Sequence, residues 1–388
     1  MNNYLETVSA LALNRIFGYT PKVARTLIDR LGSASAVFAL STEEADSIFG
    51  PYRKKYPDIN PAALYKAEKE LAGLHGKGCD FIPITCNHYP TLLRECEDPP
   101  IGLYVRSNTP AEDLFQDGPY VSIVGTRDIS PYGREWCGRL VHTMAQAPVK
   151  PVIVSGFAIG VDITSHLAAL DAGLPTIAVI PVGIDDIYPH RHRAIAERLV
   201  STPGCAIISD YPPGTSAVAN NFLRRNRIIA GMSQGTILVE SKIRGGGTMT
   251  ASLAASYGRD VFALPGRIDD LRSQGCNRLI AEKVAEPIFS MATLHETLGL
   301  GRFVRTRRKE LEAEVLDRFR NSSDPATMRR LADVALFIKA NRGSTPEEIA
   351  MAMGIRYNEV LCCTGMLESE GIIESDLLQR CSINAKID

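Results

Sequence analysis

The sequence predicts an α/β fold in which helices wrap a doubly wound parallel sheet. Three observations predict it. Six short runs rich in β-branched residues recur through the middle of the chain. A stretch with helical periodicity separates each run from the next, which is the pattern of repeated strand–helix units. The chain has 388 residues, and at roughly 150 residues per domain this length predicts two or three domains.

The predicted strands are the apolar runs of this middle region. They cover residues 120–126, 151–156, 175–181, 205–209, 235–240 and 260–266. The helices between them are expected to begin near Pro131, Asp162, Arg191, Phe222 and Thr248. Six strands joined through helices predict a Rossmann-like domain over residues 77–300.

A helical segment precedes this domain. Residues 1–76 carry apolar side chains at helical spacing, interrupted by Gly18, Gly32 and Pro51, and predict a small helical domain. Its segment IFGYTPKVARTLIDRLGS is similar to helix-hairpin-helix and sterile-alpha-type (SAM) modules, which can contact a DNA backbone. A packing role also explains most of its apolar positions, and we favour that interpretation.

A second helical segment follows. Residues 301–326 are predicted to be a linker that runs into a helix, and residues 327–388 to form a winged-helix-like domain of three helices and a short strand. Thr345 and Pro346 are a typical start for the second of these helices. A winged helix binds duplex DNA or docks a protein. Its third helix carries only Arg356 as a basic residue, which favours docking.

The composition excludes several classes of protein. With 45% hydrophobic and 22% charged residues the chain is typical of globular proteins. The formal net charge is -1, so a polyanion must be held by a local patch. Nine cysteines without a C-x-x-C pair predict a reduced, cytoplasmic location. The start of the chain lacks a signal-peptide pattern and no apolar run has membrane-spanning length, so we expect no membrane association.

In open α/β sheets a ligand binds beyond the carboxyl ends of the strands, so the loops that leave the strands are the candidate sites. The loop in VGTRDISPYGRE has Gly125, Thr126 and Arg127 ahead of a helix opened by Ser130 and Pro131. Backbone N–H groups, a hydroxyl and a guanidinium meet there, which predicts an anion site. Alone the signal is weak, because a glycine in a strand-to-helix turn is common.

The loop in SGFAIGVDITSHLAAL has Ser155 and Gly156 at a strand end. Asp162 and His166 follow, four residues apart on one helix face. A catalytic zinc needs three protein ligands and this pair supplies two, so we expect no metal. A helix-capping aspartate and a hydrogen-bonded core histidine are the favoured interpretation.

The loop in GTILVESKIRGGGTMTASLAASYG is rich in glycine. The N–H groups around Gly246, Gly247 and Thr248 predict a phosphate cradle at a helix start. The loop contains neither a Walker A sequence nor the G-x-G-x-x-G pattern of dinucleotide sites. We therefore expect neither ATP nor NAD, and no other cofactor.

The segment NNFLRRNRIIAGMS gathers an aromatic ring, an amide and three guanidinium groups at a helix start. These residues are Phe222, Arg224, Arg225, Asn226 and Arg227. Arginines beside an aromatic ring predict a groove for single-stranded nucleic acid, although three arginines can also be a solvated helix face. The nearby loop YPHRHR adds Arg191 and Arg193, which strengthens the prediction of a polyanion ligand.

The order of these motifs resembles the DNA-processing protein A (DprA/Smf) family. VGTRDISPYG, SGFAIGVDITSHLAAL, TIAVIPVGIDDIYP, ISDYPPG, NFLRRNRIIAGMS, GGGTMTASLAASYGRDVFALPG and QGCNRLI follow one another as in that family. The resemblance implies a non-enzymatic protein that binds single-stranded DNA, protects it and loads the RecA recombinase during natural transformation and homologous recombination. It also implies a homodimer formed through the Rossmann-like domain.

The resemblance implies DNA contacts at residues that the motifs already select. These are Gly125, Thr126, Arg127, Phe222, Arg225, Asn226 and Arg227. Two positions depart from the family pattern: Ile159 stands where an arginine is usual, and Leu223 where a proline is usual. The first change removes a positive charge near the groove, which Arg191 or Arg193 could supply.

Two other functions compete with this interpretation. Rossmann-like nucleotide (phosphoribo)hydrolases carry a Pro-Gly-Gly-x-Gly-Thr loop that GGGTMT loosely matches, but Arg244 stands in place of the proline and the interposed residue is missing. A transcription regulator would use the C-terminal domain on duplex DNA. The acidic residues Glu347, Glu348 and Glu359 in that domain argue against this role.

Overall fold

The structure is a computed structural model, which describes residues 2–50, 59–115, 118–301, 311–320 and 324–384.

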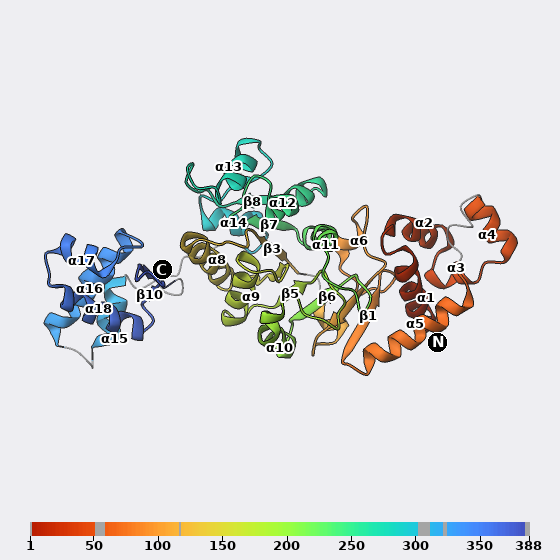
Figure 1. Ribbon diagram of the computed structural model, residues 1–388, viewed down its shortest axis with the longest axis horizontal. Helices are drawn as coiled ribbons and strands as arrows, with labels where there is room; N and C mark the ends of the chain where they lie inside the picture. Colours follow the sequence, from red (N-terminus) through yellow and green to blue (C-terminus); the bar gives the residue numbers. More distant parts are fainter. Residues whose placement is uncertain (1, 51–58, 116–117, 302–310, 321–323, 385–388) are drawn as a thin grey trace.

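A nine-stranded sheet forms the middle of the described part of the chain, in the order β1-β2-β6-β5-β4-β3-β7-β8-β9 (Figure 1). From β6 to β9 in this order all strands run parallel, whereas β1 and β2 are antiparallel to their neighbours. This confirms a mixed α/β fold with a mostly parallel sheet. The strands are β1 (Cys79–Pro83), β2 (Gly102–Arg106), β3 (Tyr120–Val124), β4 (Val152–Ser155), β5 (Thr176–Val179), β6 (Ala206–Ser209), β7 (Gly235–Leu238), β8 (Asp260–Ala263) and β9 (Glu286–Pro287).

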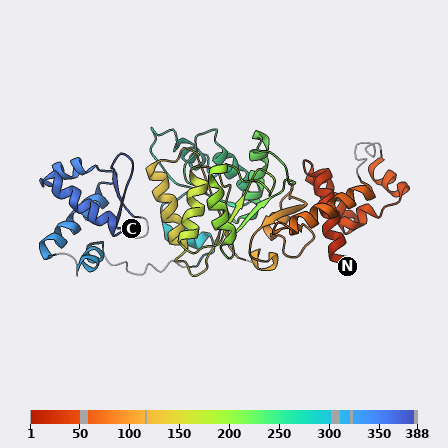
Figure 2. The same cartoon turned by 60° about the horizontal axis from the view of Figure 1, so that its bottom comes forward.

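Helices cover both faces of this sheet (Figures 1 and 2). One face carries α8 (Pro131–Met144), α9 (Val161–Asp171), α10 (Arg193–Ser201) and α14 (Met291–Thr297), and the other carries α11 (Ala219–Met232), α12 (Gly246–Ser256) and α13 (Gln274–Ala281). Strands β3, β5, β6 and β7 are buried along their whole length, as expected where helices cover both faces. The Ser122 hydroxyl of β3 donates a hydrogen bond to the carbonyl of Ile229 on α11, at 2.7 Å.

The helices begin where the sequence places capping residues. Ser130 accepts a hydrogen bond from the N–H of Gly133 at 3.0 Å, and Pro131 occupies the first turn of α8. In α9 the N-cap is Gly160, at φ 87°, so the expectation that Asp162 caps this helix is wrong. A side chain at residue 160 would meet the carbonyl oxygen of Thr126 at 2.2 Å, which explains the glycine.

The N-terminal helices pack directly on the β1 edge of the sheet (Figure 1). They are α1 (Asn2–Phe17), α2 (Pro21–Leu31), α3 (Ala34–Phe38), α4 (Thr42–Phe49) and α5 (Pro61–His75). One hydrophobic cluster runs from Leu11 and Leu71 in these helices into Phe81 and Leu103 of the sheet. The N-terminal helices and the sheet therefore share a core.

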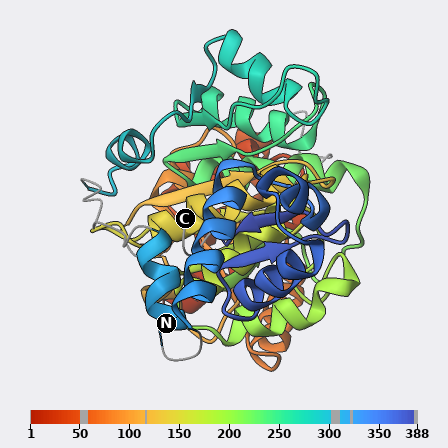
Figure 3. The same cartoon turned by 90° about the vertical axis from the view of Figure 1, so that its left-hand side faces the viewer.

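The C-terminal helices and strand pair lie together (Figure 3), and their buried side chains form a hydrophobic cluster of their own. These elements are α15 (Leu311–Phe319), α16 (Pro325–Ala340), α17 (Pro346–Met353), α18 (Tyr357–Ser369), β10 (Ile373–Ser375) and β11 (Cys381–Ile383). Helix α15 lies inside the range predicted as a linker. Its Leu311, Val315 and Phe319 are buried in the C-terminal cluster because their spacing of four residues places them on one helix face.

Short elements complete the described chain. They are α6 (Thr91–Arg94), α7 (Ala111–Leu114) and the 3₁₀ turn η2 (His190–His192). Strands β1, β2, β9 and β11 are absent from the prediction. Within the residues that the structure describes, no helix combines the length and apolarity that crossing a bilayer would require.

Candidate nucleic-acid interface

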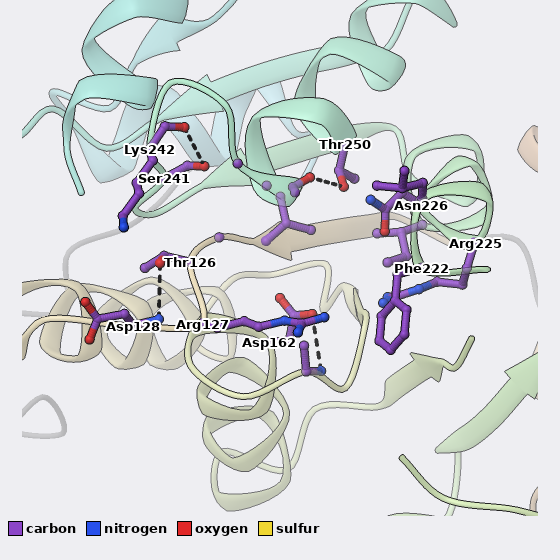
Figure 4. Close-up of a pocket in the computed structure, with 18 of the residues that line it drawn as sticks. Thr126, Arg127, Asp128, Asp162, Phe222, Arg225, Asn226, Ser241, Lys242 and Thr250 are labelled. Atoms are coloured by element: carbon purple, nitrogen blue, oxygen red, sulfur yellow. Dashed lines mark hydrogen bonds between the residues drawn. The ribbon is translucent and has the colours of Figure 1, made fainter. Parts of the chain in front are cut away.

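The site lies at the point where the strand order reverses. From β3 the chain proceeds to β4, β5 and β6 on one side and then returns to β7 on the other side of β3. The helices that follow β3 and β7, α8 and α12, cover opposite faces of the sheet, so a crevice opens at the carboxyl ends of these strands. A cavity of about 720 Å³ lies there (Figure 4).

Three segments supply most of the cavity lining. The loop after β3 gives Gly125, Thr126, Arg127 and Asp128; the loop after β7 and the start of α12 give Ser241, Lys242, Arg244, Gly245, Gly246 and Gly247; and α11 gives Phe222, Leu223, Arg225, Asn226 and Ile229. The structure thus brings together three of the sequence-predicted motifs: the loop after β3, the glycine-rich loop and the start of α11.

The loop after β3 is held by its backbone. The N–H of Thr126 donates to the carbonyl of Glu240 at 2.7 Å, so the predicted use of this N–H for an anion is wrong. The Thr126 hydroxyl accepts a hydrogen bond from the N–H of Asp128 at 3.1 Å and keeps a proton that it can donate. Arg127 is exposed, and its guanidinium carbon lies 5.0 Å from the centre of the Phe222 ring.

Arg225 is a buried cation that points at the cavity (Figure 4). The residue is 3% exposed, and its Nε and Nη1 have no hydrogen-bond partner. Burial lowers the pKa of Arg225 to about 10, against the attraction of Asp162. Burial also raises the pKa of the Asp162 carboxyl, an effect that Arg225 opposes. A buried guanidinium with two unpaired donors is costly without a ligand, so its place in the cavity indicates an anion site.

Gly156 makes room for this guanidinium. A Cβ atom at residue 156 would lie 1.7 Å from Nη1 of Arg225 and 2.6 Å from Oδ2 of Asp162. Ser155 has a different place: its hydroxyl is fully buried and donates to the carbonyl of Ile123 at 2.6 Å. Both residues therefore shape the site from behind its surface.

Because of this close approach, Gly156→Ala should displace the Arg225 guanidinium and lower the affinity for an anionic ligand by at least about tenfold, the value of one charged hydrogen bond. Fluorescence anisotropy with a labelled single-stranded oligonucleotide measures the change. Gly73→Ala is the matched control, since a Cβ there meets no atom within 4 Å. Wild-type affinity in Gly156→Ala would show that Arg225 in its present position does not contact the ligand.

The glycine-rich loop brings backbone close to backbone. A Cβ at Gly247 would lie 2.9 Å from the Cα of Gly125, so the loops after β3 and β7 touch at two glycines. Helix α12 starts here, and its N-cap residue, Gly245, makes no side-chain cap. Thr248 lies beneath the loop, where its hydroxyl donates to Ser241 or to the carbonyl of Lys242, at 2.8 and 2.9 Å. The N-terminal end of α12 therefore borders the cavity with its positive dipole end.

The side chains of the predicted cluster, residues 222–227 of α11, lie in two different environments. Phe222, Arg225, Asn226 and Ile229 are three or four residues apart and share the cavity face. Arg227 is 6% exposed and points away, toward Asp210, with which it forms an ion pair at 2.5 Å, and toward the carbonyl of Asp98. Arg224 also lies outside the cavity, against the turn between α1 and α2.

The second predicted basic segment, YPHRHR, reaches the cavity through Tyr188 and not through its arginines. Arg191 and Arg193 are exposed and are not among the lining residues of the cavity. Between them, His192 is buried and its Nδ1 lies 3.1 Å from the carbonyl oxygen of Phe157, to which it can donate a hydrogen bond. Ile159, at the position of the missing arginine, is also outside the lining.

His166 is a core residue, as predicted. It is fully buried, its Nδ1 lies 2.7 Å from the Thr176 hydroxyl, and burial lowers its pKa to about 3. Among the residues that the structure describes, no group of three His, Cys, Asp or Glu side chains could hold a metal ion.

Lys242 and Arg244 are cavity residues that the sequence analysis missed. The sequence does contain a pattern that could have identified them, because two basic residues stand between the end of a strand and a run of three glycines. Together with Arg127 and Arg225 they make this end of the sheet positive, although the chain as a whole is nearly neutral.

Comparisons with known proteins agree with these features. Protein Smf from Escherichia coli is 38% identical over 215 residues, 55% of this chain and 56% of that protein, so the match spans little more than half of the relative. DNA processing protein DprA from Bacillus subtilis is 35% identical over 233 residues, 60% of this chain and 76% of that protein.

Solved structures are similar as well. DNA processing protein A from Streptococcus pneumoniae superposes with a TM-score of 0.52 at 32% identity, covering 64% of this chain and 88% of that one. A structure from Helicobacter pylori, described for its single-stranded DNA binding mode, gives a TM-score of 0.48 at 32% identity over 54% of this chain and 92% of that one. The family model for DNA recombination-mediator protein A matches residues 80–299. Because this match covers more than half of the chain, the chain belongs to the DNA recombination-mediator protein A (DprA/Smf) family.

Proposed function

We propose that this chain binds single-stranded DNA in the cavity that the loops after β3 and β7 form with α11, protects that strand, and loads the RecA recombinase onto it during natural transformation and homologous recombination. One observation carries the proposal: the buried guanidinium of Arg225, two of whose nitrogens have no hydrogen-bond partner, faces a cavity that also holds Arg127 and Phe222. Membership in a family of recombination mediators supports the biological role.

The residues of the cavity suit a single strand. Arg127, Arg225 and the N-terminal end of α12 bind phosphates, and the Phe222 ring stacks on a base. A base reaches that ring only when it is not stacked in a duplex. Two contacts fix the Phe222 ring: its centre lies 5.4 Å from that of the Tyr188 ring in an edge-to-face arrangement, and the Arg127 guanidinium lies over it.

The other predicted site residues take supporting roles in this proposal. Gly125, Thr126, Asn226, Gly246 and Gly247 contact the strand; Ser155, Gly156 and Thr248 shape the cavity; Arg191 and Arg193 attract the strand from outside; and Arg224 and Arg227 hold α11 in place.

Fluorescence anisotropy with single-stranded and duplex oligonucleotides, over a series of salt concentrations, tests the proposal. Preference for the single strand and a negative slope of log affinity against log salt concentration are expected. Preference for duplex would move DNA binding to the C-terminal domain. No binding at all would favour the nucleotide hydrolase, whose support is the glycine-rich start of α12, and release of ribose phosphate from nucleoside monophosphates would establish it.

Phe222→Ala should lower the affinity for single-stranded DNA by about five- to 150-fold, since stacking of a base on an aromatic side chain contributes about 1–3 kcal/mol. Phe222→Tyr keeps the aromatic face and should bind nearly as well as wild type. The same anisotropy titration compares the variants. Equal affinities for the alanine variant and the wild type would exclude Phe222 as a stacking site.

The proposed assembly is a homodimer through the Rossmann-like domain, which would place two cavities in one particle. The loop between β8 and α13 suits such a contact, because Ile268 is 90% exposed and Leu271 62% exposed. Sedimentation velocity of the purified chain decides between monomer and dimer. Co-sedimentation with RecA tests the second proposed partner.

The flanking domains complete the proposed organisation. In this proposal residues 1–76 are the SAM or helix-hairpin-helix-like domain, residues 77–300 the Rossmann-like domain and residues 327–388 the winged-helix-like domain, against which helix α15 packs. Helices α16, α17 and α18, followed by the β10–β11 hairpin, have the order of a winged helix. The acidic first turns of α17 and α18 favour a protein partner over DNA for this domain.

A further inference from the structure

The side of α11 that faces away from the cavity meets the N-terminal helices through Arg224. One guanidinium nitrogen, Nη2, donates to the carbonyl of Gly18, and the guanidinium carbon lies 4.4 Å from the centre of the Tyr19 ring. The other nitrogen, Nη1, is buried and has no hydrogen-bond partner. A cation is therefore held under an aromatic ring and keeps an unused donor.

Tyr19 is an unusual tyrosine for a structural role, because it is 72% exposed. It lies in the tight turn between α1 and α2, where the N–H of Thr20 donates to the carbonyl of Phe17. The turn is closely packed, since a Cβ at Gly18 would lie 2.6 Å from the carbonyl oxygen of Asn14. The ring is thus fixed by the turn and by Arg224, and most of its surface faces solvent.

An exposed apolar path connects this ring with the cavity. Leu223 lines the cavity and is 45% exposed, and Val218, directly before α11, is 52% exposed. Phe222, Leu223 and Arg224 are consecutive residues near the start of α11. The first turn of this helix carries no acidic residue. A polyanion that leaves the cavity over the start of α11 therefore meets apolar side chains and a cation, and no carboxylate of that turn.

We propose that Tyr19, stacked on Arg224, is a second base-stacking site for single-stranded DNA, contributed by the N-terminal helices. This inference rests on the proposed function, because it continues the strand bound at Phe222. Phe222 and Arg224 lie on opposite sides of α11, and a helix with its side chains is about 10–12 Å wide. At about 3.4 Å per nucleotide, the strand crosses that width in about three nucleotides. The N-terminal helices then lengthen the binding site.

Tyr19→Trp gives a direct test. The chain has one tryptophan, Trp136 on α8, which contacts Tyr132 and Arg139 and serves as a constant background in the wild type. An oligothymidylate of about 15 nucleotides should quench the new tryptophan, whereas a dinucleotide, which is shorter than the crossing of about three nucleotides, should bind in the cavity alone and leave the tryptophan unchanged. Equal quenching by the short oligonucleotide, or none by the long one, would overturn the proposal.

Affinities provide the second readout. Tyr19→Ala should weaken binding of the long oligonucleotide by about tenfold, within the range of stacking on one base, and leave binding of the short one unchanged. Tyr19→Phe should bind like wild type. Tyr65→Ala is the matched control, because Tyr65 is also exposed in the N-terminal helices and carries the Lys69 ammonium 4.5 Å from its ring centre on α5.

The two proposals fail in different ways. If the wild type binds both oligonucleotides and Tyr19→Ala binds the long one equally well, the stacking site at Tyr19 is wrong and the cavity remains the DNA site. If the wild type binds neither oligonucleotide, the proposed function is wrong and this inference with it.

Discussion

Arg225→Ala is expected to lower the affinity for single-stranded DNA by about a hundredfold or more, the largest effect of any single change in the cavity. The Arg225 guanidinium is buried and two of its nitrogens lack partners. A hydrogen bond to a charged group contributes about 1.5–3 kcal/mol, so two such bonds to a phosphate give a loss of this size. The anisotropy titration measures it, and the salt slope should fall by about 0.7 for each phosphate that the variant no longer neutralises.

Arg127→Ala is the comparison within the same cavity. Arg127 is exposed, so its interaction with phosphate is screened by water, and a smaller loss is expected. If the double variant Arg127→Ala/Arg225→Ala bound single-stranded DNA as well as wild type, the DNA site would lie elsewhere.

The Arg225→Ala variant needs a control for folding, because it leaves Asp162 buried without its cation. The pKa of the Asp162 carboxyl is already raised by burial, and removal of Arg225 raises it further. A group with a raised pKa in the folded state favours folding at low pH and disfavours it as the pH rises through that pKa. Arg225→Ala should therefore lose stability as the pH rises from acid to neutral, and Asp162→Asn in the same chain should remove this dependence.

Arg227→Met should lower the free energy of unfolding by about 3–5 kcal/mol, the usual cost of leaving one partner of a buried ion pair alone. Arg227 and Asp210 are 6% and 5% exposed, and Arg227 also donates to the carbonyl of Asp98. Urea unfolding followed by circular dichroism measures the change. The affinity of the folded variant for single-stranded DNA should stay within a few-fold of wild type, because this guanidinium does not line the cavity.

A double variant separates the ion pair from the fold. Arg227→Met/Asp210→Asn removes both charges and should recover much of the stability, since no unpaired ion remains in the core. A strong decrease of DNA affinity in Arg227→Met with wild-type stability would contradict the structural role and make Arg227 a phosphate-binding residue.

The parallel strands could be predicted from the sequence because each is a local signal. The run at residues 120–124, for example, is flanked by a turn and a helix cap. A strand that is buried on both faces is a continuous apolar run, so such a run is enough to identify it. Strands β1 and β2 were missed for the opposite reason. Their segments, CDFIP and GLYVR, pair with each other and with β6, about a hundred residues further on, and no local pattern records that pairing.

The site was predictable to the extent that topology determines it. The rule that ligands bind where the strand order reverses brings Gly125 and Arg127 to the same cavity as Arg225. The sequence grouped Arg224 and Arg227 with them because all are neighbours in the chain. A helix of 3.6 residues per turn sends these two in other directions, and their partners, Tyr19 and Asp210, lie in segments that the sequence does not connect with them.

Because the N-terminal helices share a core with the sheet, we do not expect the sheet and its covering helices to fold without them. Excision before residue 77 would strip the cover from Phe81 and Leu103 and would leave the Tyr104 hydroxyl without Glu70, to which it donates at 2.8 Å. A bare apolar sheet edge of this kind invites aggregation. If a shortened chain failed to bind DNA, the result would therefore reflect its poor solubility. Single substitutions at the surface are the better test of what the N-terminal helices contribute to DNA binding.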